Sequence, residues 1–96
     1  MAKAILELHT KREYAGGEIV ELPIWRLPEA SSERPHGLKY SLFYGRDGRR
    51  IVGYDNERGK GDHRHILEIE EEYIFTSTDN LIADFLESVE KIGGLK

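Results

Sequence analysis

The chain has 96 residues, of which 39% are apolar and 33% charged, and these values describe one globular domain, 1–96, rather than a disordered segment. The absence of cysteine excludes disulfides, thiolate catalysis and zinc–cysteine sites. A net charge of −4 argues against a protein that coats nucleic acid by bulk attraction, and it leaves room for a local basic patch.

The first half of the chain has the alternating pattern of half-buried strands. Apolar and polar side chains alternate over residues 3–10, which predicts a first strand. Residues 18–27 predict a second strand, in which Pro23 indicates an edge position or a bulge because proline cannot donate to a sheet ladder. Residues 39–44 predict a third strand with its tyrosines and Leu42 on one face.

A tight turn is expected directly after the third strand. The Asp47-Gly48 pair is typical of a two-residue hairpin, because a type I′ turn needs positive φ at both central positions. Residues 50–55 then form a fourth strand antiparallel to the third. Residues 66–75 are apolar at both ends and rich in glutamate between, which indicates a fifth strand or an extended crossing.

The C-terminal segment has the pattern of an amphipathic helix. Ser77 or Thr78 can cap it, and Asp79 suits its first turn. A Gly-Gly pair at 93–94 ends it. The apolar stripe consists of Leu81, Ile82, Phe85, Leu86, Val89 and Ile92. The predicted fold class is therefore α+β, an antiparallel sheet of four to five strands packed on one face by one C-terminal amphipathic helix.

The segment between the fourth and fifth strands holds the most chemistry. Residues 55–65 contain no aliphatic side chain, and they combine two aspartates, two histidines, three cations and two glycines. Such a stretch buries almost nothing, so folding alone does not explain its composition. We interpret it as the active or binding loop.

Four side chains of this loop are candidate catalytic residues: Asp55, Asp62, His63 and His65. On an extended chain His63 and His65 point to the same side, roughly 6–7 Å apart at the backbone. They could act as general base and general acid across one phosphodiester, with no cofactor. Equally, Asp62, His63 and His65, with Asp55 as another oxygen donor, could hold a divalent metal ion. The structural alternative is two exposed histidines that cap a turn.

Candidate substrate-binding residues surround these four. Arg58 and Lys60 beside exposed backbone N–H groups suit phosphate, although a flexible charged turn explains them equally well. Arg64 is a third candidate cation, and in a regular strand it faces away from the histidines and can pair with a carboxylate. Tyr54 could stack on a base and Asn56 hydrogen-bond to one. The alternatives are a core aromatic for Tyr54 and a strand-ending turn for Asn56.

Two further features lie outside this loop. Arg46, Arg49 and Arg50 gather at the predicted hairpin tip, where they either hold a phosphate backbone or form a solvated turn. His36 lies in the polar connection before the third strand, which could fold toward the motif.

Four segments of the chain combine into one recognisable pattern. They are LPIWRLP at 22–28, HGLKYSL at 36–42, VGYDNERGKGDHRH at 52–65, and YIFTS at 73–77 followed by LIADFL at 81–86. Together they resemble the TumE family, with a signature that runs from Tyr54 to His65. That family comprises small prokaryotic toxins of toxin–antitoxin pairs, which are usually encoded beside a helix-turn-helix antitoxin. The resemblance therefore implies an antitoxin partner and RNA as the presumed substrate.

Three hypotheses follow for the function. The first is a toxin that acts as an endoribonuclease through the Asp-His-Arg-His segment. The second is a non-enzymatic interaction module, and the third is a metal-binding or nucleotide-binding protein that uses the same loop. No apolar run approaches the roughly 20 residues of a membrane span, so we expect a cytoplasmic protein without membrane contact. Homo-oligomer formation is left open.

Overall fold

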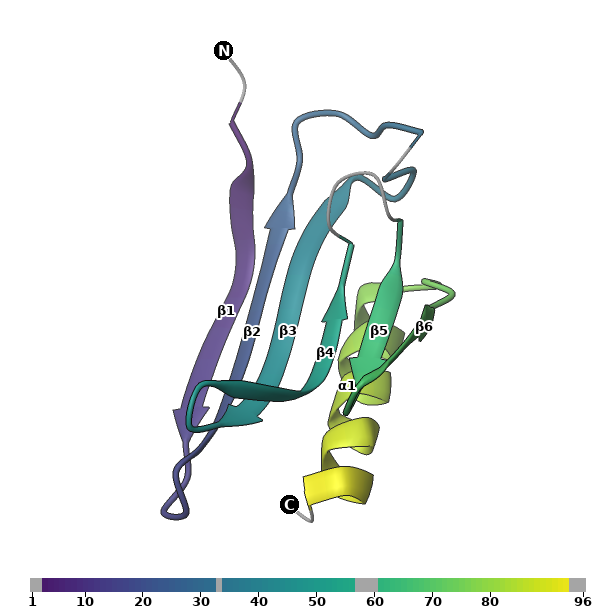
Figure 1. Ribbon diagram of the computed structural model, residues 1–96. Coiled ribbons are helices and arrows are strands. Elements are labelled where there is room, and N and C mark those ends of the chain that lie inside the picture. The colour runs from purple at the N-terminus through teal and green to yellow at the C-terminus, as the bar shows by residue number, and fades with distance from the viewer. Residues whose placement is uncertain (1–2, 33, 57–60, 94–96) are drawn as a thin grey trace.

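The computed structural model describes residues 3–32, 34–56 and 61–93 and shows one antiparallel sheet with a single helix on one face (Figure 1). The order in the sheet follows the chain, so each strand pairs with its sequence neighbour. The elements are β1 (Ile5–Glu13), β2 (Glu18–Arg26), β3 (Leu38–Arg46), β4 (Arg49–Asp55), β5 (His63–Ile66), β6 (Ile69–Glu72) and α1 (Thr78–Gly93). The α+β class is thus confirmed.

The sheet has six strands within the described residues, so the predicted count of four to five is wrong. The difference lies in residues 66–75, expected as one strand, which contain the turn between β5 and β6. Leu67 occupies this turn with a φ of 57°, and its N–H donates to the Ile51 carbonyl at 2.8 Å. The turn contains no glycine, asparagine or proline, so its sequence gave no turn signal.

The position of Pro23 corrects another expectation. Strand β2 has neighbours on both sides, so Pro23 does not lie on a sheet edge. Its pairing with β1 continues through His9, whereas pairing with β3 stops at Glu21 and resumes at Ile24 without a change of register. The missing donor is therefore accommodated by a local interruption of the β2–β3 ladder rather than by a bulge there.

The Asp47-Gly48 turn is confirmed, with φ of 54° and 76° at the two residues. The register between β3 and β4 shifts by one residue just beyond this turn. Tyr44 pairs with Val52 but Gly45 pairs with Arg50, so Ile51 is an extra residue on β4. This β-bulge reverses the face of the sheet toward which the side chains of the preceding β4 residues point.

The core lies between the sheet and α1. Ser77 caps the helix, because its Oγ accepts the Asn80 N–H at 3.0 Å. The prediction that Leu86 and Ile92 belong to the buried stripe is wrong, since their exposed fractions are 46% and 43%. The face of α1 that is buried against the sheet is therefore narrower than the predicted stripe. Gly94, part of the predicted helix end, lies outside the described residues. The buried core residues are Val20, Leu22, Ile24, Leu38, Tyr40, Leu42, Tyr44, Val52, Tyr54, Tyr73, Leu81, Phe85 and Val89.

Among the described residues, no helix is both long and apolar enough to cross a membrane.

Candidate active site

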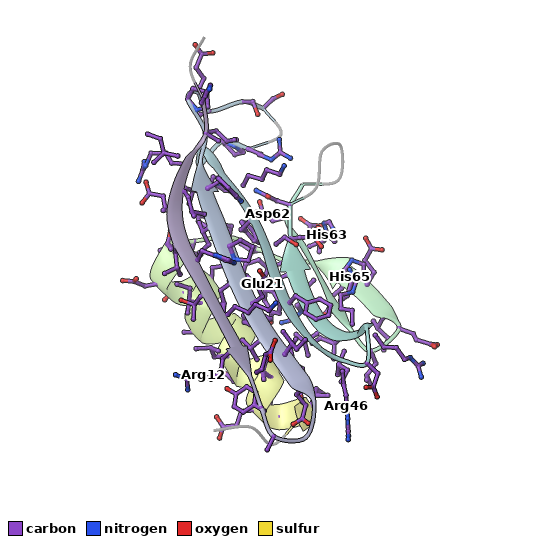
Figure 2. All side chains as sticks on the ribbon, turned by 90° about the vertical axis from the view of Figure 1, so that its left-hand side faces the viewer. Arg12, Glu21, Arg46, Asp62, His63 and His65 are labelled. Atoms are coloured by element: carbon purple, nitrogen blue, oxygen red, sulfur yellow. The ribbon has the colours of Figure 1, made fainter. Side chains whose placement is uncertain are left out.

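Asp55, His63 and His65 form a cluster on the sheet face opposite α1. Asp55 ends β4 and pairs in register with His63 at the start of β5. The two histidines occupy alternate positions of β5 and therefore point to the same side, with ring centroids 5.1 Å apart (Figure 2). One ligand atom from each of the three residues lies within 4.8 Å of the others. The alternation of a strand therefore delivers the histidine geometry that the sequence predicts.

Hydrogen bonds fix the ring of His63. Its Nδ1 lies 3.0 Å from the Gly61 carbonyl, and its Nε2 lies 2.8 Å from Asp55 Oδ1. A carbonyl only accepts, so Nδ1 carries a proton. Nε2 then faces a carboxylate, and the contact is satisfied by a proton held between the two residues or by a cation that both bind. A histidine whose other nitrogen donates to a backbone carbonyl is also typical of a metal ligand.

His65 is held less tightly, and its environment favours the neutral ring. Burial lowers the pKa of His65 below its ordinary value of 6.5, and the positive charge of Arg50 lowers it further. Glu70 opposes this shift from a distance of 4.0 Å. Near neutral pH His65 therefore offers an unprotonated nitrogen, the form that a general base needs.

The bulge in β4 and the glycine at position 53 place Arg50 beside His65. If Ile51 took its place in a regular ladder instead of a bulge, strand alternation would turn Arg50 toward the helix side with Val52. Gly53 pairs with His65, and a Cβ on Gly53 would lie only 2.6 Å from Arg50 Cδ. The bare backbone of Gly53 thus lets the Arg50 side chain lie over β4 at the residue that pairs with His65.

A hollow of about 380 Å³ adjoins the cluster, lined by Lys39, Ser41, Asp55 and their neighbours. Ser41 pairs with Asp55, so the polar face of β3 continues the polar face of β4. With Lys39 exposed and Arg50 crossing Gly53, cations contribute to this face from two strands. Asp55 and Glu70 lie on the same face, so these two cations balance two carboxylates and give the face local positive positions in an acidic chain.

The carboxylate of Asp62 belongs to a separate hydrogen-bonded cluster, although Asp62 adjoins His63 in the chain. Its carboxylate accepts from Tyr40 Oη at 2.6 Å and contacts His36 Nε2 at 3.0 Å. His36 Nδ1 accepts the Leu38 N–H at 3.2 Å, so its proton is on Nε2 and points at Asp62. The ring of His36 also packs on Phe75, with centroids 4.1 Å apart. His36 thus folds toward the motif, where it anchors Asp62 to the β3 end of the sheet.

The other candidate substrate-binding residues of known placement make structural contacts. Asn56 is buried, accepts the Tyr40 N–H through Oδ1 and donates to the Leu38 carbonyl through Nδ2. Tyr54 is buried under α1, where its Oη contacts Ser88 Oγ at 2.7 Å. Arg64 faces the helix side and pairs with Glu71, as strand alternation predicts. Arg58 and Lys60 lie outside the described residues.

Sequence reasoning placed Arg50 at the hairpin tip only and overlooked Lys39 and Ser41. The last two have a signal in the sequence, because they alternate with the apolar residues of the third strand. Arg50 has none, because a bulge cannot be located from alternation alone. The pairing of Asp55, rather than Asp62, with His63 likewise depends on the antiparallel register of β4 and β5.

Neither the curated proteins nor the solved structures contain a match to this chain. A family model described as toxin TumE matches residues 3–92, which covers every strand and nearly all of the helix. A toxin of this kind implies an antitoxin as its partner in general. The chain therefore belongs to the TumE family of toxins.

Proposed function

We propose that this toxin is an endoribonuclease that cleaves RNA in the cytoplasm, with Asp55, His63, His65 and Arg50 as its active site. The observation that carries the proposal is that Asp55 and His63, in contact at 2.8 Å, lie on the same sheet face as His65, whose pKa is lowered by burial and by Arg50. Two differently protonated groups side by side are what general acid–base catalysis requires. Arg50 supplies the cation that such a reaction on a phosphodiester needs.

The residues divide the reaction between them. His65 removes the proton of a 2′-hydroxyl, and that oxygen attacks the adjacent phosphorus. As the P–O5′ bond breaks, the proton held between Asp55 and His63 passes to the leaving 5′-oxygen. Arg50 stabilises the negative charge that develops on the phosphate oxygens. The products are a 2′,3′-cyclic phosphate and a 5′-hydroxyl.

A metal-dependent version of the same proposal uses the same three donors. A divalent ion would replace the proton between Asp55 and His63 and take His65 as its third protein ligand. The bond from His63 Nδ1 to the Gly61 carbonyl would then orient a ligand ring. Asp62, proposed from sequence as a ligand beside His63 and His65, is bonded instead to His36 and Tyr40.

The partner that we expect is a helix-turn-helix antitoxin. The family supports an antitoxin in general, and the helix-turn-helix type comes from the sequence resemblance alone.

Cleavage of a labelled mixed-sequence RNA tests the proposal. We expect His65→Ala to lower the cleavage rate by about 10²–10⁴-fold, the usual contribution of a general base. His9→Ala is the matched control, because His9 also contacts a glutamate but lies on β1, and we expect it to cleave like the wild type. Urea unfolding of both variants shows whether the fold is retained.

EDTA and the chemistry of the product ends separate the two versions. Cyclic phosphate ends that form in EDTA support the acid–base version, whereas activity lost in EDTA and restored by a divalent ion supports the metal version. If His65→Ala cleaved at the wild-type rate, the site assignment would be wrong. If the wild type cleaved no RNA, the fold would serve as an interaction module instead.

A further inference from the structure

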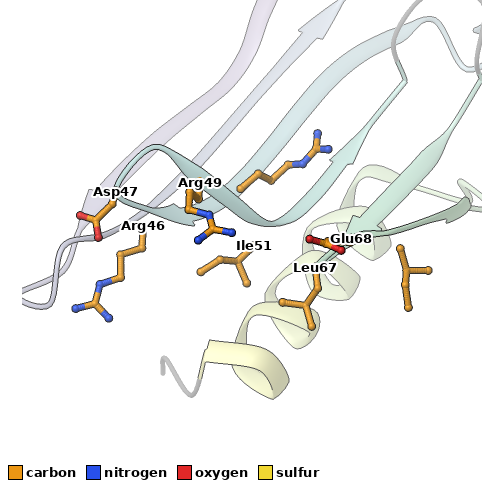
Figure 3. Close-up of a pocket in the computed structure, with 8 residues that line it drawn as sticks. Arg46, Asp47, Arg49, Ile51, Leu67 and Glu68 are labelled. Atoms are coloured by element: carbon orange, nitrogen blue, oxygen red, sulfur yellow. The ribbon is translucent and has the colours of Figure 1, made fainter.

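A groove of about 670 Å³ lies between the β3–β4 turn and the β5–β6 turn (Figure 3). Its apolar surface comes from Ile51, Leu67 and Ile69, and the last two are 58% and 67% exposed. Exposed aliphatic residues grouped at one site mark a binding surface more often than scattered ones do. Leu67 is exposed although its backbone has the left-handed φ that glycine or asparagine adopts more easily.

Three arginines lie on the β3–β4 side of this apolar surface. Arg46 and Arg49 face each other across the end of the β3–β4 hairpin, and Arg50 follows. Within residues 3–32, 34–56 and 61–93, none of the three has a carboxylate partner within ion-pair distance. The groove also contains Asp47 and Glu68, so its lining carries a surplus of one positive charge (three arginines less two carboxylates) in a chain of net charge −4.

The groove is continuous with the candidate active site through Arg50. This residue lines the groove, and its side chain lies over Gly53, the residue that pairs with His65. Strand β4 extends beyond the end of β5, because their last pair is Val52 with Ile66. A ligand can therefore pass from the histidine face, beside Arg50, into the space between the two turns.

We propose that this groove binds the RNA substrate as a single strand, an inference that rests on the function proposed above. Arg46 and Arg49 bind phosphates on one side of the scissile bond, and unstacked bases lie on Ile51, Leu67 and Ile69. Cations on one side of a groove with apolar contacts on the other suit single strands, whose bases are free to leave the stack. A duplex keeps its bases inside and presents only its phosphates to such a surface, so it loses the apolar contacts.

Fluorescence anisotropy with a labelled mixed-sequence single-stranded RNA tests this inference without turnover when the His65→Ala protein is used. Added to that protein, Arg46→Ala/Arg49→Ala should weaken binding at least about tenfold and reduce the slope of log K against log salt by about 1.4. Lys11→Ala/Arg12→Ala is the matched control, because it removes the same charge from β1 and should bind like its parent. Leu67→Ser/Ile69→Ser should weaken binding without a change in salt slope.

Two results would overturn the inference. One is equal RNA binding by Arg46→Ala/Arg49→Ala and by the Lys11→Ala/Arg12→Ala control, which would indicate that the groove binds a protein partner instead. The other is equal affinity for the single strand and for its duplex. Failure of the proposed function appears separately, as RNA that binds to the wild type but is not cleaved in the previous assay.

Discussion

At the scale of single residues, the effect of the Arg50 charge on the pKa of His65 predicts the pH dependence of cleavage. Both burial and Arg50 lower the pKa of His65 below 6.5. The base is active only when neutral, so kcat/KM should fall on the acid side with a midpoint below pH 6.5. Removing the positive charge by Arg50→Met should raise the pKa of His65 and move this midpoint to higher pH.

An NMR titration of the His65 ring in EDTA measures this shift independently of catalysis. Arg49→Met is the control, because Arg49 is not among the charges that shift the pKa of His65. An unchanged His65 titration in Arg50→Met would refute this influence of the Arg50 charge. The same shift makes the folded state bind fewer protons than the unfolded state, so His65 should lower the free energy of unfolding as pH falls from about 6.5 through its folded pKa.

At the same scale, alternation in the sequence was enough to predict that His63 and His65 share a side while Arg64 faces the other way. It could not decide which aspartate joins them. Asp62 is adjacent to His63 in sequence, yet it bonds to His36 and Tyr40, which are more than twenty residues away. Asp55 joins the cluster because the β4–β5 register sets it opposite His63. Register is a tertiary property, so one sequence does not supply it.

At the scale of elements, the β5–β6 turn contains a strained leucine, and its replacement should stabilise the protein. Leu67 has a φ of 57°, which costs a leucine roughly 1–2 kcal/mol. Leu67→Gly removes that cost. Glycine also loses more backbone entropy on folding, which destabilises the folded state by roughly 0.5–1 kcal/mol. We therefore expect the free energy of unfolding to rise by about 0.5–1 kcal/mol. Urea unfolding measures it.

Glu68→Gly is the matched control for this prediction. Glu68 is in the same turn without a positive φ, so glycine there brings only its entropic cost and should destabilise. Stabilisation by Glu68→Gly equal to that by Leu67→Gly would show that strain at Leu67 is not the cause. If the groove binds RNA, Leu67→Gly should gain stability and lose affinity together, which explains why a leucine occupies this position.

Elements with strong local signals were predictable, and those that depend on tertiary pairing were not. The Asp-Gly hairpin and the capped C-terminal helix each have a complete chemical signature within a few residues. The β5–β6 hairpin lacks turn residues, and the bulge at Ile51 leaves no mark on the alternation. The bulge is nevertheless the feature that brings Arg50 to the site.

At the scale of the whole molecule, the two faces of the sheet have different tasks. The helix side is a core in which Tyr54 packs edge-on against Tyr73 and Phe85. The opposite side holds Asp55, His63 and His65 with Arg50 crossing Gly53. Because the side chains of neighbouring residues in β4 and β5 point to opposite faces, Tyr54 and Asp55 belong to different environments although they are adjacent in sequence.

This division predicts that Tyr54→Phe changes stability and leaves catalysis unchanged. The Tyr54 hydroxyl contacts Ser88 Oγ at 2.7 Å and accepts from Arg64 Nη1 at 3.2 Å. Its loss leaves buried polar groups without a partner, so the free energy of unfolding should fall by about 1–3 kcal/mol. Values of kcat and KM on RNA, measured well below the unfolding temperature, should stay within about twofold of the wild type. The substitution lies in the core on the helix side of the sheet, and distant sites act independently.

A double-mutant cycle completes the test. Tyr54→Phe/Ser88→Ala should cost less than the sum of the two single changes, because the second removes a group that the first has already deprived of its partner. A raised KM in Tyr54→Phe would instead place Tyr54 in contact with a base, as the sequence alone allowed. Additive stabilities with normal kinetics would refute the hydrogen bond but keep the two faces separate, since Tyr54 would still act only through the core.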